Sequence, residues 1–497
     1  MSRNLKALQS VFVVVTCVTG LGPPTRAGDL NPPPGPIGPT MKPLDQVEPR
    51  TPISSLPYTI TQGGSYYLTG NLTGVAGQNG ITVIAGDVTI DLMGFTLHGV
   101  PGSLDGIGMG MLPIAISNVT VRNGTIRDWG GNGATLGDFA HMEDVSFNFS
   151  GGGGVVTNNA PQGIRVHAVG NSGDGIVLGE NGTCDNCTAS NNSGRGIFAA
   201  TGVRIHSPLV VGNGGDGIVL DARSFLEVFT SSNNGGRGVV ADKATPGLHK
   251  GTCSANGGDG IVLGEYGTCE NCTAQGNAGR GIVADKSSPK LMGCSAIGNT
   301  GGAGIVAGSS VDKSSPKLFG CHSEGNSGDG IVAGDDAVLE NCSANSNTGR
   351  GIVADKSSPK LMGCSAVGNT GGDGIVLGDG GSAENCTSRS NGGNGLEYTC
   401  RHRICYAQCV HVTSEGNALD GFLMGPGSTL TDCQALDNGG NGLTVTDNNS
   451  PPKTSATVMK GCIARGNGAI GFKLHRPPGP PSPNAAAGSP VAQVAVG

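Results

Sequence analysis

Four residues in one short segment have side chains that could hold a metal ion: Cys400, Cys405, Cys409 and His411. Three thiolates and an imidazole form a ligand set that Zn²⁺ accepts in tetrahedral sites. The same residues fit a disulfide that pins a loop and leaves one thiol over, as is common in exported proteins. The sequence favours the disulfide, so no cofactor is predicted, and zinc stays open as the alternative for this segment.

Two Cys-x-x-Cys pairs, Cys184 with Cys187 and Cys269 with Cys272, also have the spacing of metal or redox sites. In other parts of the chain an apolar residue such as Leu339 occupies the position of the earlier cysteine. We therefore expect both members of each pair to face an apolar core.

A row of charged residues alternates in sign along the chain. The row is Asp174, Arg195, Asp216, Arg237, Asp259, Arg280, then Ala303, Asp329, Arg350 and Asp373. Carboxylates alone could bind Ca²⁺, but the interleaved arginines argue against a calcium site. If these residues stack on one another they attract, at about 0–1 kcal/mol for each exposed pair.

The elements that carry these residues come from a repeat, in which a motif such as Gly-Asp-Gly-Ile-Val returns most often every 21 residues. Its second glycine stands at 133, 154, 175, 196, 217, 238, 260, 281, 304, 330, 351, 374, 395, 421, 442 and 471, with weaker copies at 80 and 106. Such a period with short Val-rich and Ile-rich runs fits one coil of three short strands. The predicted fold is an all-β solenoid of about 18 coils with 21–23 residues in a typical coil, and we expect φ > 0 at these glycines.

A second register lies nine or ten residues before most of these glycines, and it holds an apolar residue or a cysteine. The cysteines assigned to it are Cys187, Cys253, Cys272, Cys294, Cys321, Cys342, Cys364, Cys386, Cys433 and Cys462. Phe229 and Val412 fill the same place elsewhere. The position therefore asks for a small or medium apolar side chain, and we expect buried, reduced thiols there.

Five residues after that position the chain carries asparagine. These are Asn171, Asn192, Asn213, Asn234, Asn277, Asn299, Asn326, Asn347, Asn369, Asn391, Asn417, Asn438 and Asn467. Asn tolerates left-handed turns, and identical amides stacked one per coil can hydrogen-bond to each other along the axis. We interpret this register as a structural ladder.

With motifs such as Asn341-Cys342-Ser343-Ala344 followed by Asn347 and Gly351-Ile352-Val353, the sequence resembles the right-handed parallel β-helix repeat proteins of the pectin-lyase-like superfamily. The resemblance covers roughly residues 54–475. It implies a right-handed parallel β-helix, but it says little about activity, because this superfamily holds lyases, hydrolases, epimerases, adhesins and proteins of unknown role.

The residue after the inward Ile of each motif should point outward. In ten coils that residue is apolar: Val177, Phe198, Val219, Val240, Val262, Val283, Val306, Val332, Val353 and Val376. β-Propensity alone can account for Val at a strand position. An exposed apolar strip of this length would otherwise be a contact surface, and it is the predicted partner surface.

Extra residues enter the repeat at 306–317, 397–411 and 444–460, always between the Gly-Ile-Val motif and the cysteine position. The insertions are therefore predicted to lie at one corner of the solenoid. Loops along one edge are where repeat scaffolds usually carry function.

The two ends differ from the repeat. Residues 1–27 resemble a secretory signal peptide, 28–53 form a Pro-rich linker, 54–475 the β-helix, and 476–497 a disordered Pro/Ala/Gly tail. The apolar run near the start is too short to span a bilayer, and no later segment reaches the required length. We expect an exported protein that is secreted, periplasmic or at the cell surface.

The 497-residue chain has a net charge of −7, so it lacks the basic footprint that draws nucleic acid. The favoured hypothesis is a non-catalytic exported scaffold that binds a protein or a glycan along its side, or associates with itself. The alternative, permitted by the family resemblance, is a polysaccharide lyase or a related carbohydrate-active enzyme. Such an enzyme needs a base beside groups that neutralise a uronate.

Overall fold

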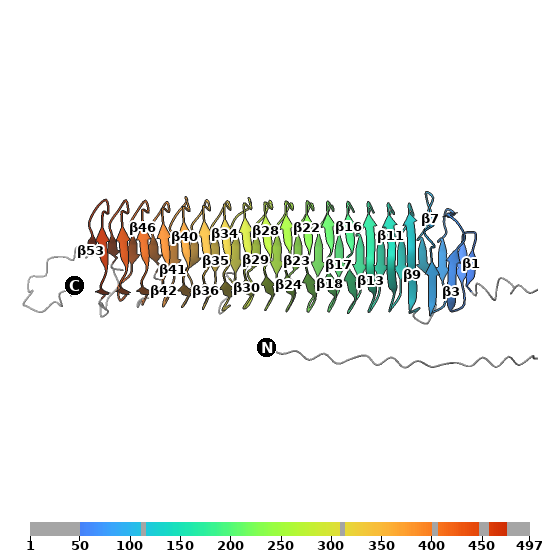
Figure 1. Ribbon diagram of the computed structural model, residues 1–497, viewed down its shortest axis with the longest axis horizontal. Helices are drawn as coiled ribbons and strands as arrows, with labels where there is room; N and C mark the ends of the chain where they lie inside the picture. The colour runs from blue at the N-terminus through green and yellow to red at the C-terminus, as the bar shows by residue number, and fades with distance from the viewer. Residues whose placement is uncertain (1–49, 111–115, 309–313, 400–405, 447–456, 475–497) are drawn as a thin grey trace, which may run out of the picture. The chain divides into compact units, whose positions relative to one another are not determined.

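The computed structural model describes residues 50–110, 116–308, 314–399, 406–446 and 457–474. Every helix or strand among them is a β-strand, from β1 (Thr51–Ile53) to β53 (Phe472–Leu474). Figure 1 shows the strands stacked in chain order along one axis, from blue to red. The predicted all-β solenoid is confirmed. In the described residues no helix is long and apolar enough to cross a membrane.

Each typical coil contributes three short strands to three parallel ladders. In one coil these are β14 (Ile176–Leu178), β15 (Thr183–Asp185) and β16 (Thr188–Ser190). They pair in parallel with β17 (Ile197–Ala199), β18 (Arg204–His206) and β19 (Leu209–Val211) of the next coil. We call the ladders through β14, β15 and β16 ladder 1, ladder 2 and ladder 3.

Ladder 1 begins at β2 (Tyr58–Ile60) and contains 19 strands among the described residues. Its first strand lacks the Gly-Ile-Val motif, which explains why the motif predicts about 18 coils. In the early coils, ladders 2 and 3 are joined in single long strands: β9 (Val119–Arg127), β11 (His141–Asn148) and β13 (Gln162–Val169). β1, which pairs with β3 (Gly64–Leu68), uses the last three residues of the predicted linker. The predicted signal peptide and tail lie outside the described residues.

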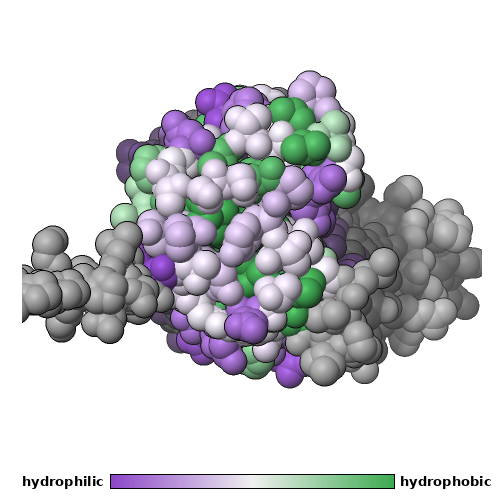
Figure 2. All heavy atoms as spheres, turned by 90° about the vertical axis from the view of Figure 1, so that its right-hand side faces the viewer, coloured by the Kyte–Doolittle hydropathy of each residue, from purple (hydrophilic) through white to green (hydrophobic). Residues whose placement is uncertain are grey.

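The core is filled by one inward residue from each register position. The apolar residue at the start of each ladder 1 strand, which is most often Ile, the residue two further on and the cysteine position are almost all fully buried. The end that carries β1 and β3 shows separate apolar patches among polar residues where its atoms are visible in Figure 2. Burial of this apolar surface is the main driving force for stacking the coils.

The expectation of φ > 0 at the motif glycines is wrong. Gly281 and Gly351 are absent from the left-handed region, which is occupied by other residues such as Asn341 and Ser346. A Cβ on Gly281 would lie 2.5 Å from the carbonyl oxygen of Gly304 and 2.6 Å from Cβ of Ala296. The motif requires glycine because neighbouring coils approach closely at this point, not because of the torsion angle.

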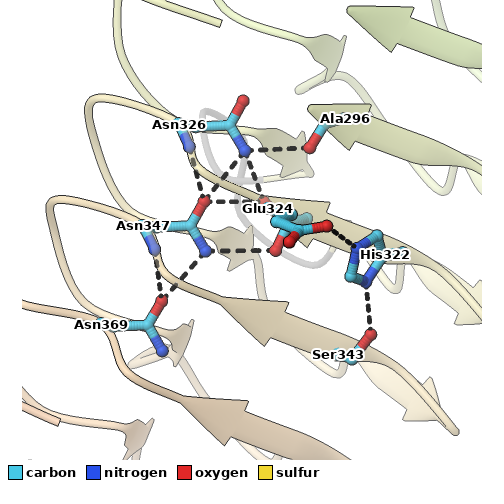
Figure 3. A network of polar contacts seen from close by, with 8 residues as sticks. Ala296, His322, Glu324, Asn326, Ser343, Asn347 and Asn369 are labelled. Atoms are coloured by element: carbon cyan, nitrogen blue, oxygen red, sulfur yellow. Dashed lines mark hydrogen bonds and ion pairs between the residues drawn. The ribbon is translucent and has the colours of Figure 1, made fainter. Parts of the chain in front are cut away.

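The buried asparagines form a chain of hydrogen bonds along the axis (Figure 3). Nδ2 of Asn326 donates to Oδ1 of Asn347 at 2.9 Å, and Nδ2 of Asn347 donates to Oδ1 of Asn369 at 3.0 Å. Asn256, which the sequence interpretation omitted, continues the ladder between Asn234 and Asn277. The residue before a ladder asparagine, such as Ser346, takes the left-handed conformation.

Candidate functional site

The ten-residue Val row is not the exposed strip that the sequence predicts. Five of its members are buried, Val240, Val283, Val306, Val353 and Val376, and the other five, Val177, Phe198, Val219, Val262 and Val332, are half-buried. Three of the buried ones follow an arginine by three residues. The guanidinium of Arg195 lies 4.3 Å from the ring centroid of Phe198 in the same relation, so at this coil the arginine side chain covers the row.

The Asp and Arg row forms ion pairs in units of two coils. Each arginine pairs with the aspartate of the preceding coil: Arg195 with Asp174 at 2.7 Å, Arg237 with Asp216 and Arg280 with Asp259 at 2.9 Å, and Arg350 with Asp329 at 2.8 Å. The first aspartate oxygen accepts from the backbone N–H of the same arginine. These carboxylates are used within the scaffold, which accounts for the row without calcium.

The two Cys-x-x-Cys pairs differ from one another. Cys184 and Cys187 form a disulfide, so the expected thiol at Cys187 is wrong. Cys269 and Cys272 are free, and all four sulfur atoms belong to buried residues of the core.

The cysteine position of ladder 3 holds buried, free thiols at Cys272, Cys294, Cys321, Cys342, Cys364 and Cys386. Cys253 was assigned to it wrongly, because it pairs with Ser231 and Ala274 two residues further along the strand. Burial raises the pKa of the Cys253 thiol well above its usual range and that of Cys409 to about 12. The thiols of Cys253 and Cys409 are therefore neutral packing groups of the core.

The residues proposed for zinc do not come together in the described part of the chain. Cys400 and Cys405 lie outside it. Cys409 is fully buried in β45 (Gln408–Val410), whereas His411 is exposed and lies 3.6 Å from Asp432. Within the described ranges no group of three or more His, Cys, Asp or Glu residues could hold a metal ion.

The insertions leave the repeat at one corner. Each falls after a ladder 1 strand and before a ladder 2 strand, as between β32 (Ile305–Ala307) and β33 (Lys317–Phe319) or between β50 (Leu443–Val445) and β51 (Val458–Lys460). Beside this corner Glu397 replaces the valine of the row on β44 (Leu396–Tyr398).

Glu397 shares a hydrogen bond with Asp373 of the preceding coil. That bond, together with burial, raises the pKa of Glu397 to about 7, while Asn394 and Arg350 act in the opposite direction. Two carboxyl groups that share a proton can act as general acid and base near neutral pH. The sequence interpretation did not single out Glu397 and missed this pair.

The outer surface of ladder 2 changes character along the solenoid. In the earlier coils acids and histidines are in register across successive strands: Asp185, His206, Glu227, His249 and Glu270. His206 lies 2.9 Å from Asp185, and His249 lies 3.2 Å from Glu227. This part of the surface has its polar groups paired.

The following coils carry lysines instead. β30 (Lys290–Met292), β33 and β39 (Lys360–Met362) each present a lysine and, two residues on, Met292, Phe319 or Met362. Lys290 and Lys317 are direct neighbours across the ladder, and Val338 of β36 (Val338–Glu340) separates Lys317 from Lys360.

All three lysines are exposed, and none forms an ion pair with another described residue. We call Lys290, Lys317 and Lys360, with Met292, Phe319 and Met362 beside them, the lysine strip. Like charges directly opposite each other destabilise a sheet. The sequence does carry a signal for the strip, because Lys-Leu-Met-Gly-Cys or Lys-Leu-Phe-Gly-Cys recurs at all three places.

A family model described as "Right handed beta helix region" matches residues 114–245 and 365–477. The match and the parallel ladders give the fold as a right-handed parallel β-helix, as the resemblance seen in the sequence implies. Comparison of this β-helix with curated protein sequences gives no match.

Among solved structures, the β-helix is similar to the Dettilon tailspike protein gp208, with a TM-score of 0.35 and 13% identity over 62% of this chain and 61% of that one. It is similar to the A-module of the Azotobacter vinelandii mannuronan C-5 epimerase AlgE6 (TM-score 0.27, 16% identity, 83% and 89% covered). A third is a tailspike mutant of E. coli bacteriophage HK620 in complex with a pentasaccharide (0.27, 12%, 80% and 72%). The β-helix spans less than two thirds of the first tailspike, and these similarities show the fold alone.

Proposed function

We propose that this protein is an exported β-helix scaffold that binds an acidic glycan along the outer surface of ladder 2. The observation that supports the proposal is the lysine strip. Its cations have no partner among the described residues, although the same ladder pairs its charges a few coils earlier. A carboxylated glycan would neutralise them.

The apolar side chains of the strip suit a sugar ring. Met292 and Phe319 are neighbours across the ladder, half-buried, and Met362 is 48% exposed. An extended glycan lying along the solenoid axis would meet a new strand about every 4.8 Å. A repeating acidic polymer therefore fits a surface on which cation and apolar group recur in three of four successive coils. In the remaining coil Val338 and Glu340 occupy these two positions.

The test is binding to immobilised polygalacturonate and alginate, with a neutral glucan as the reference ligand. The strip variant carries Lys290→Glu, Lys317→Glu and Lys360→Glu. Three exposed charge contacts of up to about 1 kcal/mol each correspond to roughly a hundredfold loss of affinity. Binding of the original protein should also weaken as salt rises.

The matched control changes Lys243, Lys286 and Lys356 to Glu, because these lysines lie in corner turns away from the strip. The control variant has the same net charge as the strip variant and should bind the acidic glycans with the affinity of the original protein. Equal affinities for the two variants, or equal binding to the neutral glucan, would overturn the proposal.

The proposed location outside the cell rests on the signal-like first 27 residues. N-terminal sequencing of protein recovered from the extracellular or periplasmic fraction should begin near Gly28. An unprocessed chain confined to the cytosol would contradict an exported role.

A carbohydrate-active enzyme is the second candidate, and the Asp373 and Glu397 pair is the observation that favours it. Incubation with polyuronates would then release unsaturated ends or reducing ends, and Glu397→Gln would abolish the release without weakening binding. If neither product forms from any polyuronate in the panel, the pair is a scaffold contact.

A further inference from the structure

Four polar residues form a two-by-two array on the outer surface of ladder 3. His322 and Glu324 stand at the two outward positions of β34 (His322–Glu324), and Ser343 and Asn345 at those of β37 (Ser343–Asn345). The register pairs His322 with Ser343 and Glu324 with Asn345. The array combines a hydroxyl, an imidazole, a carboxylate and an amide.

The hydrogen bonds order three of these groups in a line (Figure 3). Nδ1 of His322 lies 2.7 Å from Oγ of Ser343, and Nε2 lies 3.0 Å from Oε2 of Glu324. A carboxylate can only accept, so Nε2 carries the proton and donates it to Glu324. Nδ1 of the neutral ring is then the acceptor, and the Ser343 hydroxyl donates to it.

Among the described residues, histidine stands in this register of ladder 3 at His322 and at His167 of β13, where the next residue in register is Thr188. No hydrogen bond joins His167 to Thr188 in the described part of the chain, so the line forms at His322 alone. The positions equivalent to His322 and Ser343 in the flanking coils are Ser295 and Ser365, both in register with the array. Ser343 therefore has a base within hydrogen-bond distance, and the otherwise equivalent Ser365 has none among its neighbours in the ladder.

Asn345 supplies a second observation at the same place. Its Oδ1 is buried and has no hydrogen-bond partner within the described ranges. A buried amide oxygen that accepts no hydrogen bond is costly and calls for an explanation. Asn345 stands on the outward face of Ser343's own strand, two residues along, and its Nδ2–H group is the kind of donor that stabilises an oxyanion.

We propose that Ser343 is a nucleophile that takes the acyl group of a carboxylic ester, with His322 as its base and Glu324 as the residue that positions the imidazole. Oγ of Ser343 attacks the carbonyl carbon, and its proton passes to Nδ1 of His322. The bond from the carbonyl carbon to the alcohol oxygen breaks, and His322 returns the proton to the departing alcohol. Water then hydrolyses the acyl-serine, which regenerates the hydroxyl and releases the acid.

The side chains are placed for an external substrate. His322 is 30% exposed and Glu324 is 52% exposed, and Ser343 is half-buried beside them. The inference is independent of the lysine strip and of glycan binding, because it rests on a different ladder and concerns any accessible ester. A small ester therefore tests it directly.

The experiment uses the full chain, a fluorophosphonate probe and p-nitrophenyl acetate. Mass spectrometry should locate the phosphonyl adduct on Ser343, where the oxygen displaces fluoride. Because a general base contributes about 10²–10⁴-fold, Ser343 should react about a hundredfold faster than Ser365. Ser343→Ala and His322→Asn should remove both the adduct and the nitrophenol release, whereas Ser365→Ala should change neither.

Glu324 acts through the imidazole, so its variants are judged by the acylation rate constant rather than by folding. Glu324→Gln should slow acylation, and Glu324→Asp should restore part of the rate while thermal melting stays the same for both. Adducts spread equally over Ser295, Ser343 and Ser365, or a His322→Asn variant that reacts as fast as the original, would overturn the proposal.

Discussion

Removing one amide from the Asn ladder should open the solenoid at that coil, and Asn347→Ala is the clearest case. Oδ1 of Asn347 accepts from the backbone N–H of Asn326 at 3.0 Å and from Nδ2 of Asn326 at 2.9 Å. Its Nδ2 donates to Oδ1 of Asn369 at 3.0 Å and to the carbonyl oxygen of Ser323 at 3.2 Å. Oδ1 of Asn347 also accepts from Oγ of Ser323 at 3.4 Å, so alanine loses five bonds.

The cost follows from which partners are left unsatisfied. Nδ2 of Asn326 keeps the carbonyl oxygen of Ala296 at 2.9 Å, and Oδ1 of Asn369 keeps the backbone N–H of residue 347 at 3.1 Å. The backbone N–H of the fully buried Asn326 loses its acceptor. One orphaned buried donor at about 1–3 kcal/mol, plus the net loss of the other bonds, amounts to about 2–4 kcal/mol.

Hydrogen exchange measured by mass spectrometry on peptides that cover 326–352 reports this local free energy. A loss of about 2–4 kcal/mol corresponds to exchange that is roughly 30 to 1,000 times faster. Asn345→Ala is the matched control, because the side-chain oxygen of Asn345 has no partner to lose among the described residues. If both variants exchange alike, the ladder does not hold the coils together and the reasoning is refuted.

Three further changes test other contacts. Gly281→Ala should destabilise by about 1–3 kcal/mol through its clash with the next coil, whereas Arg280→Ala should cost less than about 1 kcal/mol; equal melting shifts would contradict this. Val283→Thr, at a 2% exposed position, should lower the melting temperature because it buries a hydroxyl, while Val262→Thr at a half-buried position should be near neutral. The pKa of Glu397 is raised from 4.5 to about 7, so the contribution of this carboxyl to stability is fully present below about pH 4.5 and is lost as the pH rises through about 7. The protection of 396–399, measured relative to the intrinsic exchange rate at each pH, should therefore fall over that interval, and Glu397→Gln should abolish this fall.

The stacking of the coils could be predicted from the sequence because it depends on registers that recur. The Ile, Cys and Asn positions each return once per coil, so counting places them in the core and along the ladder. Cys253 shows the limit of counting, because a shift of two residues keeps a side chain on the same face of a strand and leaves its burial unchanged.

The predictions that failed concerned contacts between side chains or backbone of neighbouring registers. The outward direction of Val283 follows from strand alternation, but its burial depends on side chains outside its own register, which the count of repeats does not show. The need for glycine at position 281 was foreseen, whereas its cause lies in the distance to Gly304 of the next coil.

The residues with chemical potential were the hardest to find. Glu397 occurs once in its register, and the register of His322 holds histidine at one other described position, His167, so a search for periodicity gives neither residue weight. Their partners, Ser343 and Asp373, belong to the next or the preceding coil and become neighbours only through the stacking. In a repeat protein, a residue that departs from the consensus should be considered together with the residues one period before and after it, because stacking makes them neighbours.

The pairing of each arginine with the aspartate of the coil before it also sets how the chain can change in length. Excising a single coil would bring Asp onto Asp or Arg onto Arg at the new junction. After excision of a pair of coils, such as the segment from Asp216 to Gly258, Arg195 still pairs with Asp174. Asp259 then follows Arg195 in the row, so the alternation of acidic and basic residues is unchanged. Duplication or loss of coils should accordingly proceed in twos, and a shortened solenoid for use as a molecular ruler is best designed with that step.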